Sequence, residues 1–200
     1  MDGKVASCGL LACSLFACAE NGGFGAPTDV AFLRDGTPVV SDGYENTRVA
    51  VLDKDGRVER QWGEPGDGRG ELDLPHGVAV DSQDRIFVAD RNNARIQVFS
   101  SRGEFLSIIE GPDIGRPFGL EIRDERLYVV DGGDQDPDAP AGRGVVLTLE
   151  GKLIGHFSGP GKEPGKLSDP HDIAVDSKGR VYIAELGTKR VQRFTLELPP

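Results

Sequence analysis

The chain has 200 residues and a formal net charge of -10, and glycine (28) and proline (13) are abundant. This length suffices for one domain with a hydrophobic core, and a hydrophobic content of 38% excludes a disordered chain. The acidic balance argues against nucleic acid as a partner, because binding to phosphates requires a basic surface.

We interpret residues 1–23 as a signal or lipoprotein segment, with a disordered N-terminus as the alternative. Residues 5–17 form an apolar run that is too short to span a bilayer but suits the hydrophobic region of a secretory signal. Residues 15–18, Leu-Phe-Ala-Cys, resemble a bacterial lipoprotein processing site, at which Cys18 would be lipidated. We therefore expect an extracytoplasmic protein, secreted or lipid-anchored at Cys18. A cytoplasmic location is the alternative.

Residues 24–200 contain four copies of one repeat, each beginning at a proline. The copies start at positions 27, 75, 117 and 170, so their successive separations are 48, 42 and 53 residues. Periods of about 40–50 residues with several strands each are typical of β-propeller blades.

The second repeat shows the pattern of one blade most fully. It predicts strands over residues 77–80, 85–90, 95–99 and 105–109, separated by polar turns. In the third repeat, a Gly-, Asp- and Pro-rich insertion from Asp131 to Arg143 predicts a long loop. The fourth repeat predicts strands over 180–185 and 190–194 but no clear fourth strand. The expected fold is all-β: a propeller of four-stranded antiparallel blades, with about four blades present and no helix.

Two of the three histidines occupy one equivalent position, in Pro75-His76-Gly77-Val78 and Pro170-His171-Asp172-Ile173. The copies in between and before have Phe118 and Thr28 there, so the histidine recurs in every second repeat. Equivalent positions on innermost strands converge on the propeller axis, where a set of three histidines would leave one open position on a catalytic zinc ion. This chain supplies two of the three.

A structural role for these histidines stays open, since a histidine after a proline can simply bond neighbouring backbone. His156 lies on an expected outer strand, and we interpret it as a surface residue.

The repeats resemble NHL repeats, and three segments resemble the lyase domain of peptidylglycine α-amidating enzymes. The segments are Pro27-Thr28-Asp29-Val30 with Ser41-Asp42-Gly43-Tyr44, Gln61-Trp62-Gly63-Glu64 leading to Pro75-His76, and Asp169-Pro170-His171-Asp172-Ile173. The resemblance covers about residues 24–197. It implies a six-bladed propeller that cleaves peptidyl-α-hydroxyglycine into an amidated peptide and glyoxylate.

The resemblance also implies roles for single residues. Two of the family's three zinc histidines match His76 and His171, its catalytic tyrosine matches Tyr44, and an active-site arginine matches Arg91. A structural calcium in the family is partly held by the residue that matches Asp172. The chemistry is coherent, because a tyrosine is a poor base unless a metal and an arginine favour its phenolate. The alternatives are a packed aromatic side chain in a turn for Tyr44 and a solvated charge in a turn for Arg91. For Asp29 and Asp172 the alternative is a carboxylate that accepts hydrogen bonds from turn amides.

The chain also departs from the family pattern. The third zinc histidine and a further active-site arginine are absent, and Asp169 stands where the animal enzymes have a methionine. Two histidines alone bind zinc weakly unless a carboxylate or another chain completes the site.

Three functions therefore stay open. The first is a zinc-dependent carbon–nitrogen lyase of the amidating type, with calcium as an additional ion and a peptide as substrate. The second is a non-catalytic NHL-type propeller that binds a peptide or protein. The third, a lactonase-type hydrolase, would require a ring of acidic and Asn ligands that is not evident. Self-association that completes the ring is an expected partnership under the first two.

Overall fold

The computed structural model describes residues 23–133 and 142–198, and every regular element in these residues is a β-strand. The strands form three four-stranded sheets and one three-stranded sheet, each antiparallel with its strands in chain order. We call these sheets blades 1 to 4. Blade 1 has β1 (Asp29–Phe32), β2 (Pro38–Asp42), β3 (Arg48–Leu52) and β4 (Val58–Trp62), and blade 2 has β7 (Pro75–Val80), β8 (Ile86–Asp90), β9 (Arg95–Phe99) and β10 (Phe105–Glu110). Blade 3 has β11 (Pro117–Arg123), β12 (Arg126–Asp131), β13 (Arg143–Thr148) and β14 (Leu153–Phe157). Blade 4 has β15 (Pro170–Val175), β16 (Arg180–Glu185) and β17 (Arg190–Thr195).

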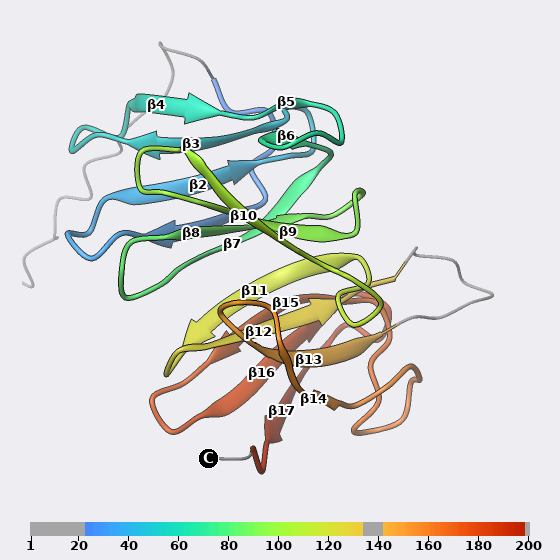
Figure 1. The fold of residues 1–200 in the computed structure, drawn as a ribbon. Coiled ribbons are helices and arrows are strands. Elements are labelled where there is room, and N and C mark those ends of the chain that lie inside the picture. Colours follow the sequence, from blue (N-terminus) through green and yellow to red (C-terminus); the bar gives the residue numbers. More distant parts are fainter. Residues whose placement is uncertain (1–22, 134–141, 199–200) are drawn as a thin grey trace, which may run out of the picture.

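The propeller predicted from the repeat period is confirmed. In Figure 1 the blades follow one another from the blue end of the chain to the red end, with a short parallel pair, β5 (Glu64–Pro65) and β6 (Glu71–Leu72), between blades 1 and 2. The four strands expected in the second repeat are present, and blade 4 has three strands in the described residues. The predicted loop spans the gap between β12 and β13, and its residues 134–141 lie outside the described residues. The expected signal segment and Cys18 also lie outside them, in residues 1–22.

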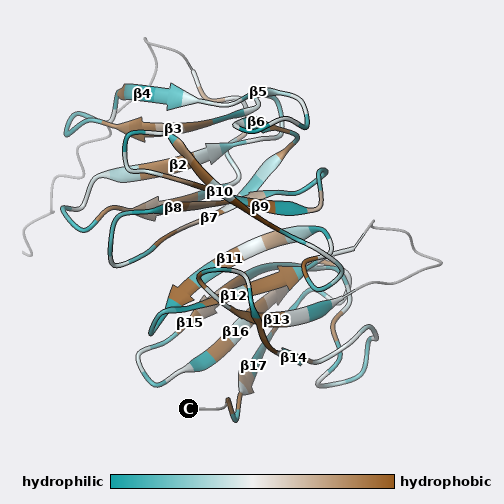
Figure 2. Cartoon of the chain, in the orientation of Figure 1, coloured by the Kyte–Doolittle hydropathy of each residue, from teal (hydrophilic) through white to brown (hydrophobic). Residues whose placement is uncertain are grey.

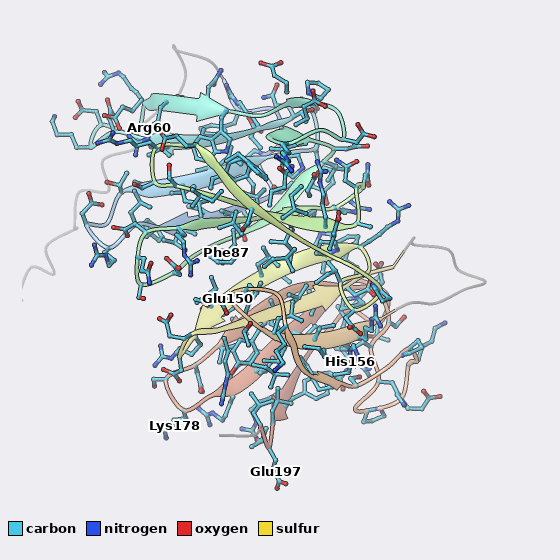
Figure 3. All side chains as sticks on the ribbon, in the orientation of Figure 1. Arg60, Phe87, Glu150, His156, Lys178 and Glu197 are labelled. Atoms are coloured by element: carbon cyan, nitrogen blue, oxygen red, sulfur yellow. The ribbon has the colours of Figure 1, made fainter. Side chains whose placement is uncertain are left out.

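The hydrophobic core lies between neighbouring blades rather than within any one of them. One cluster joins blades 1 and 2, a second joins blades 2 and 3 through Phe87, and a third joins blades 3 and 4 through Phe118. Figure 2 shows hydrophobic colouring on the middle strands and hydrophilic colouring on many turns. In Figure 3, Arg60, Lys178 and Glu197 lie at the periphery, whereas Phe87 lies among the strands. Each blade is therefore stabilised mainly by its neighbours.

An acidic residue and an arginine recur at the same place in every blade. The acid ends the second strand and is paired in register with the arginine that begins the third; the pairs are Asp42 with Arg48, Asp90 with Arg95, Asp131 with Arg143, and Glu185 with Arg190. Each arginine Nε lies 2.7–3.0 Å from a carboxylate oxygen. The same carboxylate accepts a backbone N–H from the segment that leads into the blade; the donors are Gly25, Asp73, Arg116 and Ser168. This motif fixes the start of each innermost strand.

The innermost strands approach one another closely because glycines follow the repeated proline. Strand β11 contacts both β7 and β15. A Cβ atom on Gly119 would lie 2.9 Å from the backbone of Asp172 and Ile173, and one on Gly77 would collide with the carbonyl of Phe118. The residues that flank these glycines are therefore held close together around the axis. The described residues contain no helix that is long and apolar enough to cross a membrane.

Candidate active site

The residues that follow the repeated proline in successive blades lie together at one end of the axis. The ring centroids of His76 and His171 are 4.7 Å apart, and that of Phe118 lies 5.0 Å from His76 and 5.2 Å from His171. In blade 1, the Thr28 hydroxyl donates to the Pro75 carbonyl at 2.9 Å. The repeat therefore delivers two imidazoles to one place, with Phe118 packed against both.

Tyr44, in the turn after β2, reaches both imidazoles. Its hydroxyl oxygen lies 3.1 Å from Nε2 of His76 and 3.4 Å from Nε2 of His171. The ring meets His76 edge-on, with centroids 5.6 Å apart, and 49% of the residue is exposed. The two Nε2 atoms thus face a single point at the solvent-accessible end of the axis.

Both imidazoles are neutral at pH 7. Burial lowers the pKa of His76 to about 4, and a proton on His171 would act in the same direction. Burial also lowers the pKa of His171. The Nδ1 atom of His76 lies 3.1 Å from the Phe118 carbonyl, which can only accept, so Nδ1 carries the proton and Nε2 presents a lone pair to Tyr44. This is the form in which histidine binds metals.

Arg91 lies beside this group, in the turn after β8. Its guanidinium carbon is 4.0 Å from the centroid of the Phe118 ring, a cation–π contact. Burial lowers the pKa of Arg91, whereas the nearby Tyr44 and Asp169 act to raise it. The Arg91 side chain is therefore packed on an aromatic ring at the site.

The donor set fits a zinc ion only in part. A catalytic zinc site has three protein ligands, and His76 and His171 supply two neutral imidazole nitrogens. In residues 23–133 and 142–198, no group of three or more His, Cys, Asp or Glu side chains is arranged to hold a metal ion. These residues could therefore hold zinc only with a further ligand.

Three carboxylates lie farther along the axis, around a cavity of about 470 Å³ lined by Asp29, Glu121 and Asp172. Burial raises the pKa of Asp29 to about 6 and that of Glu121 to about 7, and the charge of Asp172 adds to both effects. The Oδ1 atom of Asp172 accepts a hydrogen bond from the backbone N–H of Ile173 at 2.8 Å. A hydrogen bond to a backbone amide is the alternative role given above for this carboxylate. Carboxylate oxygens are also the ligands that calcium prefers.

Three residues of the region were not assigned a role from the sequence. The sequence marks Phe118 only as a replaced histidine and Asp169 only as a departure from the family pattern, and it gives no signal for Glu121. The repeat alignment could have flagged Phe118, because it shares the histidine position. His156, labelled in Figure 3, lies on β14 away from the site and pairs with Asp113 at 3.1 Å. The surface role expected for it agrees with this position.

Fold and site together define an NHL-type β-propeller with a histidine–tyrosine–arginine cluster at one end of its axis. The family model of the NHL repeat matches residues 72–99 and 167–194, which lie in blades 2 and 4. The likeness to solved structures is one of fold: a catalytically inactive virginiamycin B lyase from Staphylococcus aureus, solved with quinupristin, matches 88% of this chain and 55% of its own at a TM-score of 0.65 and 18% identity.

The sequence relatives are more specific. The chain is 36% identical over 186 residues to the peptidylglycine alpha-amidating monooxygenase of Rattus norvegicus, a match that covers 86% of this chain and 18% of the relative. It is 31% identical over 195 residues to the peptidyl-alpha-hydroxyglycine alpha-amidating lyase 1 of Drosophila melanogaster, covering 86% and 35%. The chain thus spans less than half the length of each of these relatives. It is an NHL-repeat propeller similar in sequence to amidating enzymes.

Proposed function

We propose that the protein is a peptidylamidoglycolate lyase-like metalloenzyme, which cleaves peptidyl-α-hydroxyglycine to an amidated peptide and glyoxylate. The observation that carries the proposal is the Tyr44 hydroxyl placed between the Nε2 atoms of His76 and His171. Names of relatives that include a hydroxyglycine lyase support the same reaction class.

The chain's own residues divide the work. Tyr44, acting as its phenolate, takes the proton of the substrate hydroxyl, the electron pair of that O–H bond forms the aldehyde of glyoxylate, and the C–N bond breaks. The amide nitrogen receives the C–N electron pair and then the proton, which Tyr44 returns. Arg91 stabilises negative charge on Tyr44. When bound to His76 and His171, zinc would polarise the substrate hydroxyl.

One further ion, calcium, and one partner, a second copy of the chain, belong to the proposal. Asp172 is the carboxylate that would bind calcium on the axis, beside the carboxyl groups of Asp29 and Glu121 that line the same cavity. A second copy of the chain is the proposed partner of the open blade faces, on which Phe32 of β1 and Val191 of β17 are 58% and 69% exposed. If the purified chain sediments as a monomer, the proposed pairing with a second copy of the chain is wrong. An extracytoplasmic location rests on the signal-like run alone.

The experiment is glyoxylate release from an α-hydroxyglycine-extended peptide, together with zinc content. We compare the wild type with His171→Ala and Tyr44→Phe, and use His156→Ala as the matched control on the outer strand. We expect His171→Ala to lose zinc and activity, and Tyr44→Phe to keep zinc but lose about 10²–10⁴-fold in rate, the usual contribution of a general base. Equal release by the wild type and His171→Ala would contradict the proposal.

A further inference from the structure

Buried polar atoms without a partner are concentrated at the site. In the part of the chain that the structure describes, four buried side-chain nitrogen or oxygen atoms have no hydrogen-bond partner, and three of them are Nδ1 of His171, Oδ1 of Asp169 and Nε of Arg91. Such atoms are rare in folded proteins and each requires an explanation. Asp169 precedes His171 by two residues in the chain, and its charge acts on both His171 and Arg91.

The two imidazoles differ in what holds them. Nδ1 of His76 donates to the Phe118 carbonyl, which leaves its Nε2 free to accept from Tyr44. Nδ1 of His171 has no such acceptor. The single proton of the Tyr44 hydroxyl can serve only one imidazole, so the tautomer of His171 is not set by Tyr44 when that proton goes to His76.

An acid at position 169 is not required by the backbone. Asp169 precedes the repeated proline with φ 56°, and the equivalent residues of blades 1 and 2, Ala26 and Leu74, adopt φ 59° and 55°. Alanine and leucine therefore tolerate this left-handed conformation in the same motif. The backbone conformation alone therefore does not require a carboxylate at position 169.

We propose that Asp169 is the positioning carboxylate of His171, accepting the Nδ1–H of the imidazole at its buried Oδ1, either after a side-chain rotation or through one bridging water. Histidines that bind metals usually donate their other ring N–H to a carboxylate or carbonyl. Asp169 thereby does for His171 what the Phe118 carbonyl does for His76. Both Nε2 lone pairs then face the point beside Tyr44. The role of His171 as a ligand rests on the proposed function, but its tautomer does not.

The test is the tautomer of His171 in the metal-free protein. The chain has only three histidines, so ¹⁵N-imidazole correlation spectra at pH 7.5 give one signal pattern for each. In the wild type we expect His171 with Nδ1 protonated. In Asp169→Ala, we expect His171 to change to the Nε2–H form; alanine occupies the equivalent position 26 of blade 1 with the same left-handed φ. Asp169→Asn keeps an acceptor oxygen, so His171 should stay in the Nδ1–H form.

His76 is the internal control, because its acceptor is a backbone carbonyl and its tautomer should be the same in all three proteins. Zinc affinity, measured by competition with a chelator, should fall about 10–100-fold in Asp169→Ala and less in Asp169→Asn. An unchanged His171 tautomer in Asp169→Ala would overturn the proposal. A changed tautomer without lyase activity in the wild type would leave it standing and overturn the proposed function instead.

Discussion

His76 and His171 come from equivalent positions but acquire different surroundings. His76 is 4% exposed and fixed by the Phe118 carbonyl, whereas His171 is less buried and feels the charge of Asp169. The repeat fixes where each backbone lies, and the neighbouring blade decides what each ring touches. The chemistry of the site is therefore determined residue by residue on a nearly symmetric frame.

Glu121 gives the protein a pH dependence with a definite sign. Its pKa in the folded protein is raised to about 7, above an ordinary value of 4.5, so the folded state holds the proton more tightly than the unfolded state. The contribution of Glu121 to the free energy of unfolding is full below pH 4.5 and is lost as the pH rises through 7. In the presence of a chelator, Glu121→Gln should therefore be about 1–2 kcal/mol more stable than the wild type at pH 8, a value reduced for partial solvent screening, and nearly equal at pH 4.

Urea unfolding at the two pH values measures this difference, with Glu150→Gln as the control on an exposed turn (Figure 3). The free energy of unfolding of Glu150→Gln should equal that of the wild type at both pH values. If the free energies of unfolding of the wild type and Glu121→Gln change in the same way between the two pH values, the pKa of Glu121 is not raised by folding.

The repeat spacing was sufficient to predict His76 and His171 as neighbours, because it places equivalent residues at the same height on the axis. Tyr44 was assigned to the site by the resemblance to the amidating enzymes. The sequence was not sufficient for Asp169 or Glu121. Their roles depend on which side chains of other blades lie within a few ångströms and on how far water is excluded, and neither quantity is encoded in the spacing of one strand.

At the scale of the element, the recurring acid–arginine pair connects three segments of each blade. In blade 2, Asp90 is fully buried and accepts from Arg95, Asn93, Gln97 and the backbone of Asp73. The strand pattern of the sequence predicted β8 and β9 correctly but did not reveal this network. Charged residues at strand ends look like ordinary turn residues until the register pairs them.

Asp90→Ala should therefore be strongly destabilising. It leaves a nearly buried arginine without its counter-ion, a change that typically costs about 3–5 kcal/mol. Asp55→Ala, which removes an exposed partner of Lys54 and Arg57, should cost less than about 1 kcal/mol. Denaturant unfolding monitored by the single tryptophan, Trp62, compares the two. A loss of stability for Asp90→Ala as small as that for Asp55→Ala would mean that the network is not needed to hold the blade.

At the scale of the whole molecule, the cores between blades and the close approach of the innermost strands serve the same end. They hold residues that are far apart in sequence, 95 positions for the two histidines, at the same end of one axis. The number of blades could be predicted from the repeat period. The convergence of the site could be expected only because a propeller has an axis.

An anomalous-scattering crystal structure at the zinc absorption edge, from protein crystallised with zinc, would show directly whether His76 and His171 bind one zinc ion. We predict a peak about 2.0–2.1 Å from Nε2 of both His76 and His171, with Tyr44 beside it. A structure in which the two Nε2 atoms share no anomalous peak, while zinc binds elsewhere or not at all, would contradict the account.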